Sequence, residues 1–254
     1  MSSENIFEDF EIHRVTDTLF QLPVLGYDIA LTNTAVFMLI SVIGCTLFLV
    51  FAMQPRAVIP GRFQMLAEKL YDLVGNMLES GAGPKAKQFF PLVFTIFMFI
   101  LFCNLFGLLP VLSANSATSH VIVNFAISSI LFIVIISYGF IKHGIGWIKL
   151  FVPKGLPFFL VPILMCIELF SFLIRPFSLA IRLFGNMLAG HLLLHVFIGL
   201  TIGLLGAGWL AGLSILPFLL NLVLIGFEFF VAFLQAYIYA VLASVYLHDA
   251  VEMH

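Results

Sequence analysis

A stretch of 54 residues from Gln88 to Ile141 contains no Asp, Glu, Lys or Arg. About 20 helical residues cross the roughly 30 Å core of a bilayer, so this stretch is long enough for two spans. Backbone polar groups in lipid must be hydrogen-bonded within their own segment, which leaves helices as the expected structure. In a chain that is 62% hydrophobic and only 9% charged, this run predicts an all-α integral membrane protein. A net charge of -2 provides no basic surface for nucleic acid.

Hydropathy and turn-forming residues divide the chain into an exposed N-terminal segment, 1–28, and one membrane domain, 29–254. The N-terminal segment is acidic and lacks the basic start of a secretory signal, so we expect it to be retained. Near the C-terminus, hydropathy permits either two long tilted helices or three shorter ones. The expected elements are a span at 29–53, an interfacial helix at 61–83, spans at 89–111 and 120–141, a tilted helix or hairpin at 156–205, and a tilted helix at 212–248.

Segment 61–83 differs from the spans because it is amphipathic. Apolar residues recur every three or four positions, opposite polar and charged ones. This pattern predicts a helix on the membrane surface. A small soluble helix packed on a partner fits the same pattern equally well.

The distribution of basic residues predicts the orientation. Of eleven Lys and Arg, five lie between the first and second spans and three follow the third, while the loop at 113–119 has none. Because loops rich in Lys and Arg stay inside, both of these basic loops should face inward and the N-terminus outward.

Three charged residues share one face of a helix in the C-terminal region. Glu168, Arg175 and Arg182 are spaced by seven residues, and Asn186 follows one turn later. A charge at the bilayer centre costs about 2.5 to 3.5 kcal/mol on insertion scales, so each needs a reason to be there. Arg175 could snorkel to a headgroup, and Glu168 could be a neutral, hydrogen-bonded acid. Arg182 lies several turns from any helix end, which favours a functional role.

A second polar stripe lies near the C-terminus and consists of Glu228, Gln235 and Tyr239. Two histidines, His191 and His195, precede it and could simply be packed histidines. Spaced by four residues, they lack further ligands in nearby sequence, so we expect no metal site. The chain has no HExxH, GxSxG or Walker-type motif, and we expect no cofactor.

Proton or ion transfer is the chemistry that these residues permit. Glu168, His120, His191 and Glu228 can each gain and lose a proton, and so can form stepping sites. A guanidinium keeps its proton, so Arg182 would interrupt a relay while attracting a carboxylate. Since no carboxylate of this chain is well placed for that, the pattern indicates a partner that brings one.

Two segments carry a specific resemblance. "RPFSLAIRLFGNMLAGH" and "FEFFVAFLQAYIYAVLASVYL" resemble the signature segments of subunit a (subunit 6) of the rotary F-type ATP synthase, and "FCNLFGLLP" resembles the second spanning helix of that family. The resemblance extends from about residue 30 to the C-terminus. It implies five spans plus the amphipathic helix, with the last two helices long and tilted and the C-terminus inside.

The resemblance also implies a mechanism. Arg182 would face a rotating ring of c subunits, each with a membrane carboxylate, and would separate two offset half-channels. Glu168 matches an acid on the inner half-channel, and His191 and Glu228 match the pair on the outer one. Many bacterial members have Glu and His in the opposite order at these two positions, which fits two side chains that pass a proton. Each proton crossing 100 mV releases about 2.3 kcal/mol.

Further expectations follow from the same resemblance. His120 stands where many members carry an acid, and the supporting polar residues are Asn186, Gln235, Tyr239, Arg175 and Ser178. The expected partners are the c-ring, b-type peripheral-stalk subunits, the rest of the ATP synthase, the lipid bilayer and the translocated proton. Nucleotide chemistry would reside in the partner subunits. The expected location is a bacterial inner membrane, with a mitochondrial inner membrane as the alternative.

Two other classes of protein remain open. A self-contained secondary transporter or channel would usually show internal repeats, and none is evident between the halves. Co-purification with a c-ring would discriminate, because such a transporter needs none. An intramembrane hydrolase requires a nucleophile beside an activating base, whereas Ser178 is far from any His in the sequence.

Overall fold

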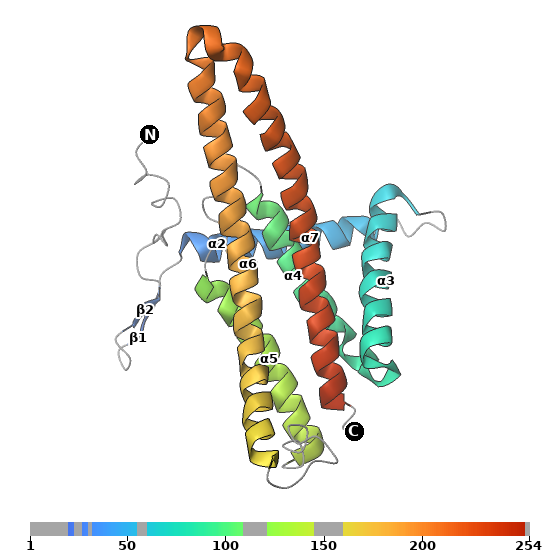
Figure 1. Ribbon diagram of the computed structural model, residues 1–254. Helices are drawn as coiled ribbons and strands as arrows, with labels where there is room; N and C mark the ends of the chain where they lie inside the picture. Colours follow the sequence, from blue (N-terminus) through green and yellow to red (C-terminus); the bar gives the residue numbers. More distant parts are fainter. Residues whose placement is uncertain are drawn as a thin grey trace. The chain divides into compact units, whose positions relative to one another are not determined.

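The computed structural model describes residues 20–22, 27–29, 32–54, 60–108, 121–144 and 160–251. These residues are almost entirely helical, and five helices are long and apolar enough to cross a membrane (Figure 1). The predicted all-α membrane fold is thereby confirmed. A short antiparallel pair, β1 (Phe20–Leu22) and β2 (Tyr27–Ile29), precedes the first span and was not predicted.

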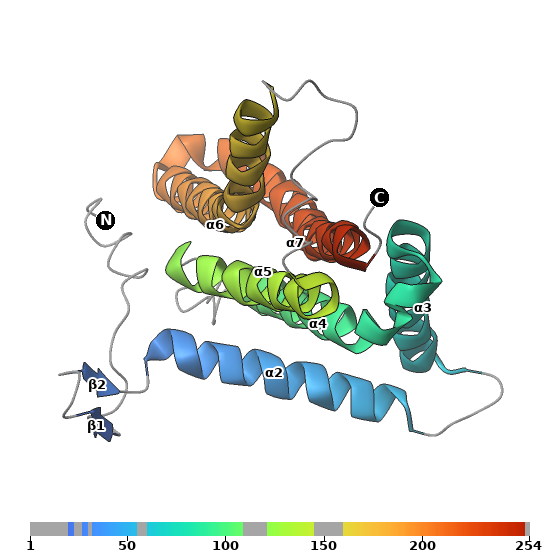
Figure 2. The same ribbon diagram turned by 90° about the horizontal axis from the view of Figure 1, so that it is seen from below.

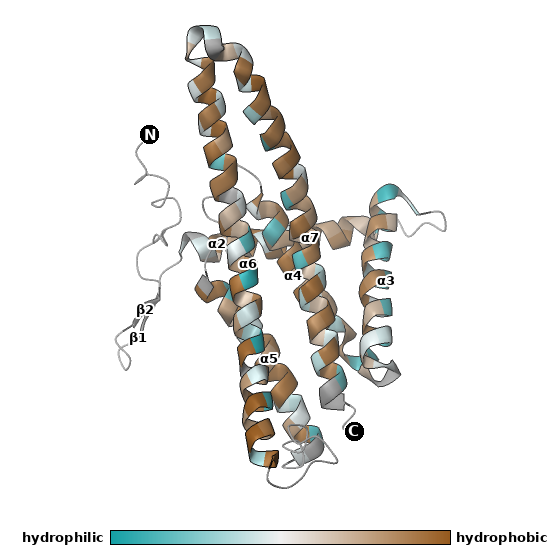
Figure 3. Ribbon diagram, viewed as in Figure 1, coloured by the Kyte–Doolittle hydropathy of each residue, from teal (hydrophilic) through white to brown (hydrophobic). Residues whose placement is uncertain are grey.

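The first three candidate spans are helices of ordinary length. They are α2 (Asn33–Ala52), α4 (Phe90–Gly107) and α5 (Val121–His143). Where Figure 3 shows them, these helices are largely brown or pale, with few teal residues, because few strongly polar residues interrupt them. A helix that is apolar on every side is expected where it faces lipid or other apolar helices. The loop predicted at 113–119 lies outside the described residues.

The last two helices are much longer. They are α6 (Val161–Leu205, 45 residues) and α7 (Ile215–Val251, 37 residues), joined through η5 (Gly208–Ser214). At 1.5 Å per residue, α6 is about 67 Å long, twice the bilayer core, so it must tilt or extend beyond the core. The alternative of three shorter helices is thus excluded. Helix α6 continues through Pro176, which removes one backbone hydrogen bond.

Helix α3 (Arg62–Ala82) is the amphipathic element. Its buried residues follow a helical stripe and are Ala67, Leu70, Val74, Leu78 and Ala82. Part of the apolar face predicted to lie on the membrane therefore packs inside the protein, whereas Phe63 and Leu66 remain exposed. The helix ends at Gly83, whose φ of 74° needs glycine, and η1 (Pro84–Phe89) then leads into α4 (Figure 2).

The chain forms two compact units. Unit 1 consists of Met1–Leu47, Phe99–His120 and Leu183–Gln235, and unit 2 of Phe48–Met98, Val121–Arg182 and Ala236–His254. In unit 1, α2 and α4 approach closely, because a Cβ at Gly44 would lie 2.5 Å from the ring of Phe106. In unit 2, Gln88 donates a hydrogen bond of 2.9 Å to the hydroxyl of Tyr138 on α5. Small residues and a few polar links thus hold otherwise apolar helices together.

Candidate functional site

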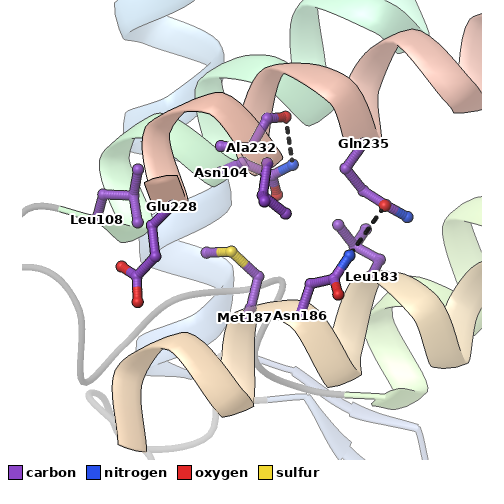
Figure 4. A pocket seen from close by; sticks show the side chains of 9 residues that line it. Asn104, Leu108, Leu183, Asn186, Met187, Glu228, Ala232 and Gln235 are labelled. Atoms are coloured by element: carbon purple, nitrogen blue, oxygen red, sulfur yellow. Dashed lines mark hydrogen bonds between the residues drawn. The ribbon is translucent and has the colours of Figure 1, made fainter. Parts of the chain in front are cut away.

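A polar pocket lies in unit 1, where α4, α6 and α7 meet (Figure 4). Its polar side chains project from the three helices into an otherwise apolar surrounding. The lining residues are Asn104, Leu108, Leu183, Asn186, Met187, Glu228, Val231, Ala232 and Gln235. Three of these, Asn186, Glu228 and Gln235, were singled out from the sequence, and the structure brings them together.

Two hydrogen bonds fix amide side chains around the pocket. The Nδ2 of Asn186 donates to Oε1 of Gln235 at 3.2 Å, which links α6 to α7. The Nδ2 of Asn104 donates to the backbone carbonyl of Ala232, also at 3.2 Å, which links α4 to α7 (Figure 4). Asn104 was not chosen from the sequence as a site residue, although an Asn inside the apolar run "FCNLFG" is a signal that could have identified it.

Several buried polar atoms around the pocket have no hydrogen-bond partner among the described residues. They are Oδ1 of Asn104, both carboxyl oxygens of Glu228 and Nε2 of Gln235. Buried polar atoms in native proteins are nearly always paired, so an unpaired group calls for an explanation. The Glu228 carboxyl, only 9% exposed, is an ionisable group that lines the pocket together with amide side chains and finds no hydrogen-bond partner in the described part of the chain.

Gly190 makes room for Glu228. A Cβ built at position 190 would contact Oε1 of Glu228 and would lie 2.8 Å from its carboxyl carbon. Real Cβ atoms essentially never show such contacts, so only glycine permits this approach of α6 to α7. Such a contact across helices becomes visible only once the helices are packed.

Arg182 lies on α6 with its side chain exposed. None of the ion pairs found among the described residues includes it. Asn186 follows it by one helical turn, so the guanidinium belongs to the same stripe of α6 as the pocket amide. An exposed cation within a candidate span, without an ion-pair partner in the described part of the chain, is a group that an external carboxylate can approach.

Glu168 and Arg175 belong to unit 2 and form an ion pair. Nη2 of Arg175 lies 3.7 Å from Oε1 of Glu168, with side chains 30% and 46% exposed. The guanidinium also lies over the rings of Phe172 and Tyr246. Arg175 therefore has partners inside the protein, which the sequence pattern did not indicate.

Tyr239, also in unit 2, is fully buried. Ser128 of α5 donates a hydrogen bond of 2.8 Å to the carbonyl of Asn124. Its single proton is thereby used, so the Tyr239 hydroxyl, 2.8 Å away, acts as the donor to Ser128. The predicted supporting residue thus ties α7 to α5.

The remaining predicted site residues are more dispersed. Ser178 and His195 lie on α6 with exposed side chains. His191 is part of α6, but its side chain is not among those described, and His120 lies outside the described residues. Within the described part of the chain, no three His, Cys, Asp or Glu side chains gather as a metal ion would require.

Comparison with known proteins identifies the family of this chain. The family described as "ATP synthase A chain" matches residues 34–248. ATP synthase subunit a of Rhizobium rhizogenes is 48% identical over 92% of this chain and 93% of its own length. The subunit a of Pelagibacter ubique is 41% identical over 98% of both chains, and that of a Wolbachia strain is 46% identical over 98% of this chain and 99% of its own. The chain therefore belongs to the ATP synthase subunit a family.

Proposed function

We propose that this chain is the proton-conducting stator subunit in the membrane sector of an ATP synthase, with Arg182 as the barrier between two half-channels. Membership in the subunit a family and five membrane-length helices support a multi-pass membrane subunit of that complex. The observation that carries the finer proposal is the exposed guanidinium of Arg182 on α6, which forms no ion pair with any described residue. A guanidinium is a permanent cation, so it would interrupt a proton relay while attracting a carboxylate.

The carboxylate would come from the c-ring, turning against the exposed face of α6 that carries Arg182. A proton arriving from outside would pass through His191 and Glu228 to a ring carboxylate. The pocket around Glu228 supports this path, since it offers a carboxyl group and amide atoms with free hydrogen-bonding capacity. His120 would belong to the outer mouth of the same path.

Glu168 would receive the proton on the inner side. Its exposure and its place on α6 two turns before Arg175 support a role outside the tightly packed core. Asn186, Gln235 and Tyr239 would hold the helices near the ring surface through their hydrogen bonds. Ser178 lies on the exposed surface of α6 between the two arginines.

The wider context follows from the same proposal. Nucleotide chemistry would reside in partner subunits, and b-type subunits would anchor this chain to the peripheral stalk. The N-terminus would face outward and the basic loops inward. The bacterial relatives support a location in a bacterial inner membrane.

The test is Arg182→Ala, measured as ATP-driven proton pumping in inverted vesicles. Passive proton leak and c-ring content are determined in the same preparation. We expect pumping to disappear in an assembled complex, and the leak to rise because the barrier is gone. Arg62→Ala, which removes an exposed cation from the start of α3, serves as the control and should pump normally.

Pumping at the wild-type rate by Arg182→Ala would show that the guanidinium has a structural role and that the proposal is wrong. Wild-type activity without any co-purifying c-ring would instead favour a self-contained transporter. Loss of pumping together with loss of the ring would be resolved by Arg182→Gln, which keeps a polar side chain of similar length without the charge. That variant should assemble and still fail to pump.

A further inference from the structure

Arg175 is held between two aromatic rings of unit 2. Its guanidinium carbon lies 5.7 Å from the ring centroid of Phe172 and 5.2 Å from that of Tyr246. A guanidinium within about 6 Å of a ring centroid is attracted by the negative face of the ring. One ring comes from α6 and the other from α7, so the cation is fixed from two helices.

The two rings are themselves fixed by packing. Phe172 lies 4.5 Å from the ring of Phe132 on α5 and 6.5 Å from that of Tyr246, measured between centroids. All three rings are buried. Because protein interiors are close-packed, these rings cannot shift without repacking three helices. We call Phe172 and Tyr246 the aromatic clamp.

The ion pair with Glu168 depends on this clamp. Glu168 precedes Arg175 by seven residues, so the arginine must reach about 10 Å along the helix axis. Its Nη2 comes within 3.7 Å of the carboxylate, which is close enough for attraction but too far for a hydrogen bond. The rings, and not a direct hydrogen bond, therefore define where the guanidinium lies.

We propose that Arg175 is a positioning residue, whose guanidinium, held by the aromatic clamp, keeps the Glu168 carboxylate at a defined place on the inner half-channel. This inference rests on the proposed role of Glu168 in proton transfer. A headgroup ligand for Arg175 is the competing assignment, but an arginine that snorkels has no need of two buried rings and an acid. Losing the cation would leave the half-exposed carboxylate without the partner that holds it in place.

The first experiment compares Arg175→Gln and Arg175→Lys in the complete ATP synthase, as proton pumping per assembled complex in inverted vesicles. We expect Arg175→Gln to lower pumping roughly five-fold, within the range of couplings between contacting residues. Arg175→Lys should retain at least about half of the wild-type rate, because an ammonium also binds aromatic faces and carboxylates. Lys142→Gln is the matched control, since it removes another cation that lies over a ring, that of Tyr138, and it should pump normally.

A double-mutant cycle separates positioning from a structural role. If Arg175 acts through Glu168, Arg175→Gln will change pumping less than about two-fold once Glu168→Gln is present. Equal losses in both backgrounds would overturn the inference, because Arg175 would then act on something other than Glu168. The clamp is tested by Tyr246→Leu, which should lower pumping roughly two- to three-fold, while Tyr246→Phe keeps the ring and the rate.

The cycle also distinguishes the inference from the proposed function. Impaired pumping by Glu168→Gln with normal pumping by Arg175→Gln would overturn only the positioning role. Normal pumping by Glu168→Gln would remove Glu168 from the proton path and overturn both. An unchanged rate in Tyr246→Leu, with Arg175→Gln impaired, would favour a headgroup ligand and contradict the clamp.

Discussion

Two glutamates of the C-terminal helices, Glu168 and Glu228, occupy opposite environments. Glu168 in unit 2 is half-exposed and lies beside the Arg175 guanidinium. Glu228 in unit 1 is buried against Gly190, and its carboxyl oxygens have no hydrogen-bond partner among the described residues. The Glu168 carboxyl thus has a cation beside it and is open to its surroundings, whereas the Glu228 carboxyl is buried and forms no ion pair with any described residue.

Under the proposed function, this difference would let one residue type serve two different steps. A buried carboxyl enclosed by helices can exchange a proton only with the few groups that reach its pocket. An exposed carboxyl beside a fixed cation can exchange with its surroundings while its position is maintained. Such a difference suits the proposed path, which would take up protons on one side and release them on the other. The environments of Glu168 and Glu228 can each be altered by separate substitutions.

The largest effect is expected from Glu228→Gln. The amide fills the same space but cannot take up or release a proton, so ATP-driven pumping should fall by at least about 100-fold, as for loss of a proton-transfer group in catalysis. Fluorescence quenching of a pH-sensitive dye in inverted vesicles measures the rate. Glu79→Gln is the control, since Glu79 lies in an exposed ion pair with Lys87. Pumping within two-fold of the wild type would show that this enclosed carboxyl is not a proton carrier.

A smaller loss of pumping is expected from Gly190→Ala, which adds a methyl group where α6 packs against the Glu228 carboxyl. Alanine normally favours a helix over glycine by about 1 kcal/mol, so propensity alone would make the change harmless. The clash with the Glu228 carboxyl outweighs this gain in helix stability, so the substitution should be harmful. We expect roughly ten-fold slower pumping, which corresponds to an increase of about 1.4 kcal/mol in the activation free energy. Gly199→Ala on the same helix meets nothing within 4 Å and should retain full activity.

The contact between position 190 and the Glu228 carboxyl can be tested further by shortening the side chain at position 228. If the clash is the cause, adding Glu228→Asp to Gly190→Ala should restore part of the pumping rate, because the carboxyl then withdraws from the new methyl group. A double variant that is slower than both single variants would contradict this packing explanation. Amounts of assembled complex are measured alongside each rate.

The smallest effect is expected from Lys87→Gln, which removes a cation from a surface carboxylate. The Lys87–Glu79 pair is shorter than the Glu168–Arg175 pair, at 3.3 Å, but both of its side chains are more than half exposed. Exposed pairs contribute about 0 to 1 kcal/mol, so pumping should change by less than about two-fold. If Lys87→Gln lowered pumping as much as Arg175→Gln, the exposed Lys87–Glu79 pair and the Arg175–Glu168 pair held by the aromatic clamp would not differ in their effect on pumping.

The sequence predicted most of the fold because the physics of spanning a membrane is local. Uncharged runs of about 20 residues can only be helices in lipid, and the positions of α2, α4 and α5 follow from them. Whether residues 156–205 form one helix or a hairpin could not be predicted, since apolar sequence of that length satisfies both. The structure has one continuous helix, α6, over Val161–Leu205.

For the candidate site, the sequence identified the polar residues but not their partners. Seven-residue spacing placed Glu168, Arg175 and Arg182 on one stripe, and insertion cost made each of them conspicuous. Asn104 was missed because it is a single amide in an apolar run. Its neighbours on α7 become apparent only when α4 packs there.

Sequence by itself thus determined the membrane class, the amphipathic α3 and the helical stripes, because these depend on composition and on spacing within one helix. Tertiary structure alone decided that Gly190 encloses Glu228 and that Phe172 and Tyr246 hold Arg175. The contacts of Gly190 with Glu228 and of Arg175 with Tyr246 join residues from different helices. Such contacts depend on how side chains interdigitate at close packing, and no periodicity along a single helix encodes that.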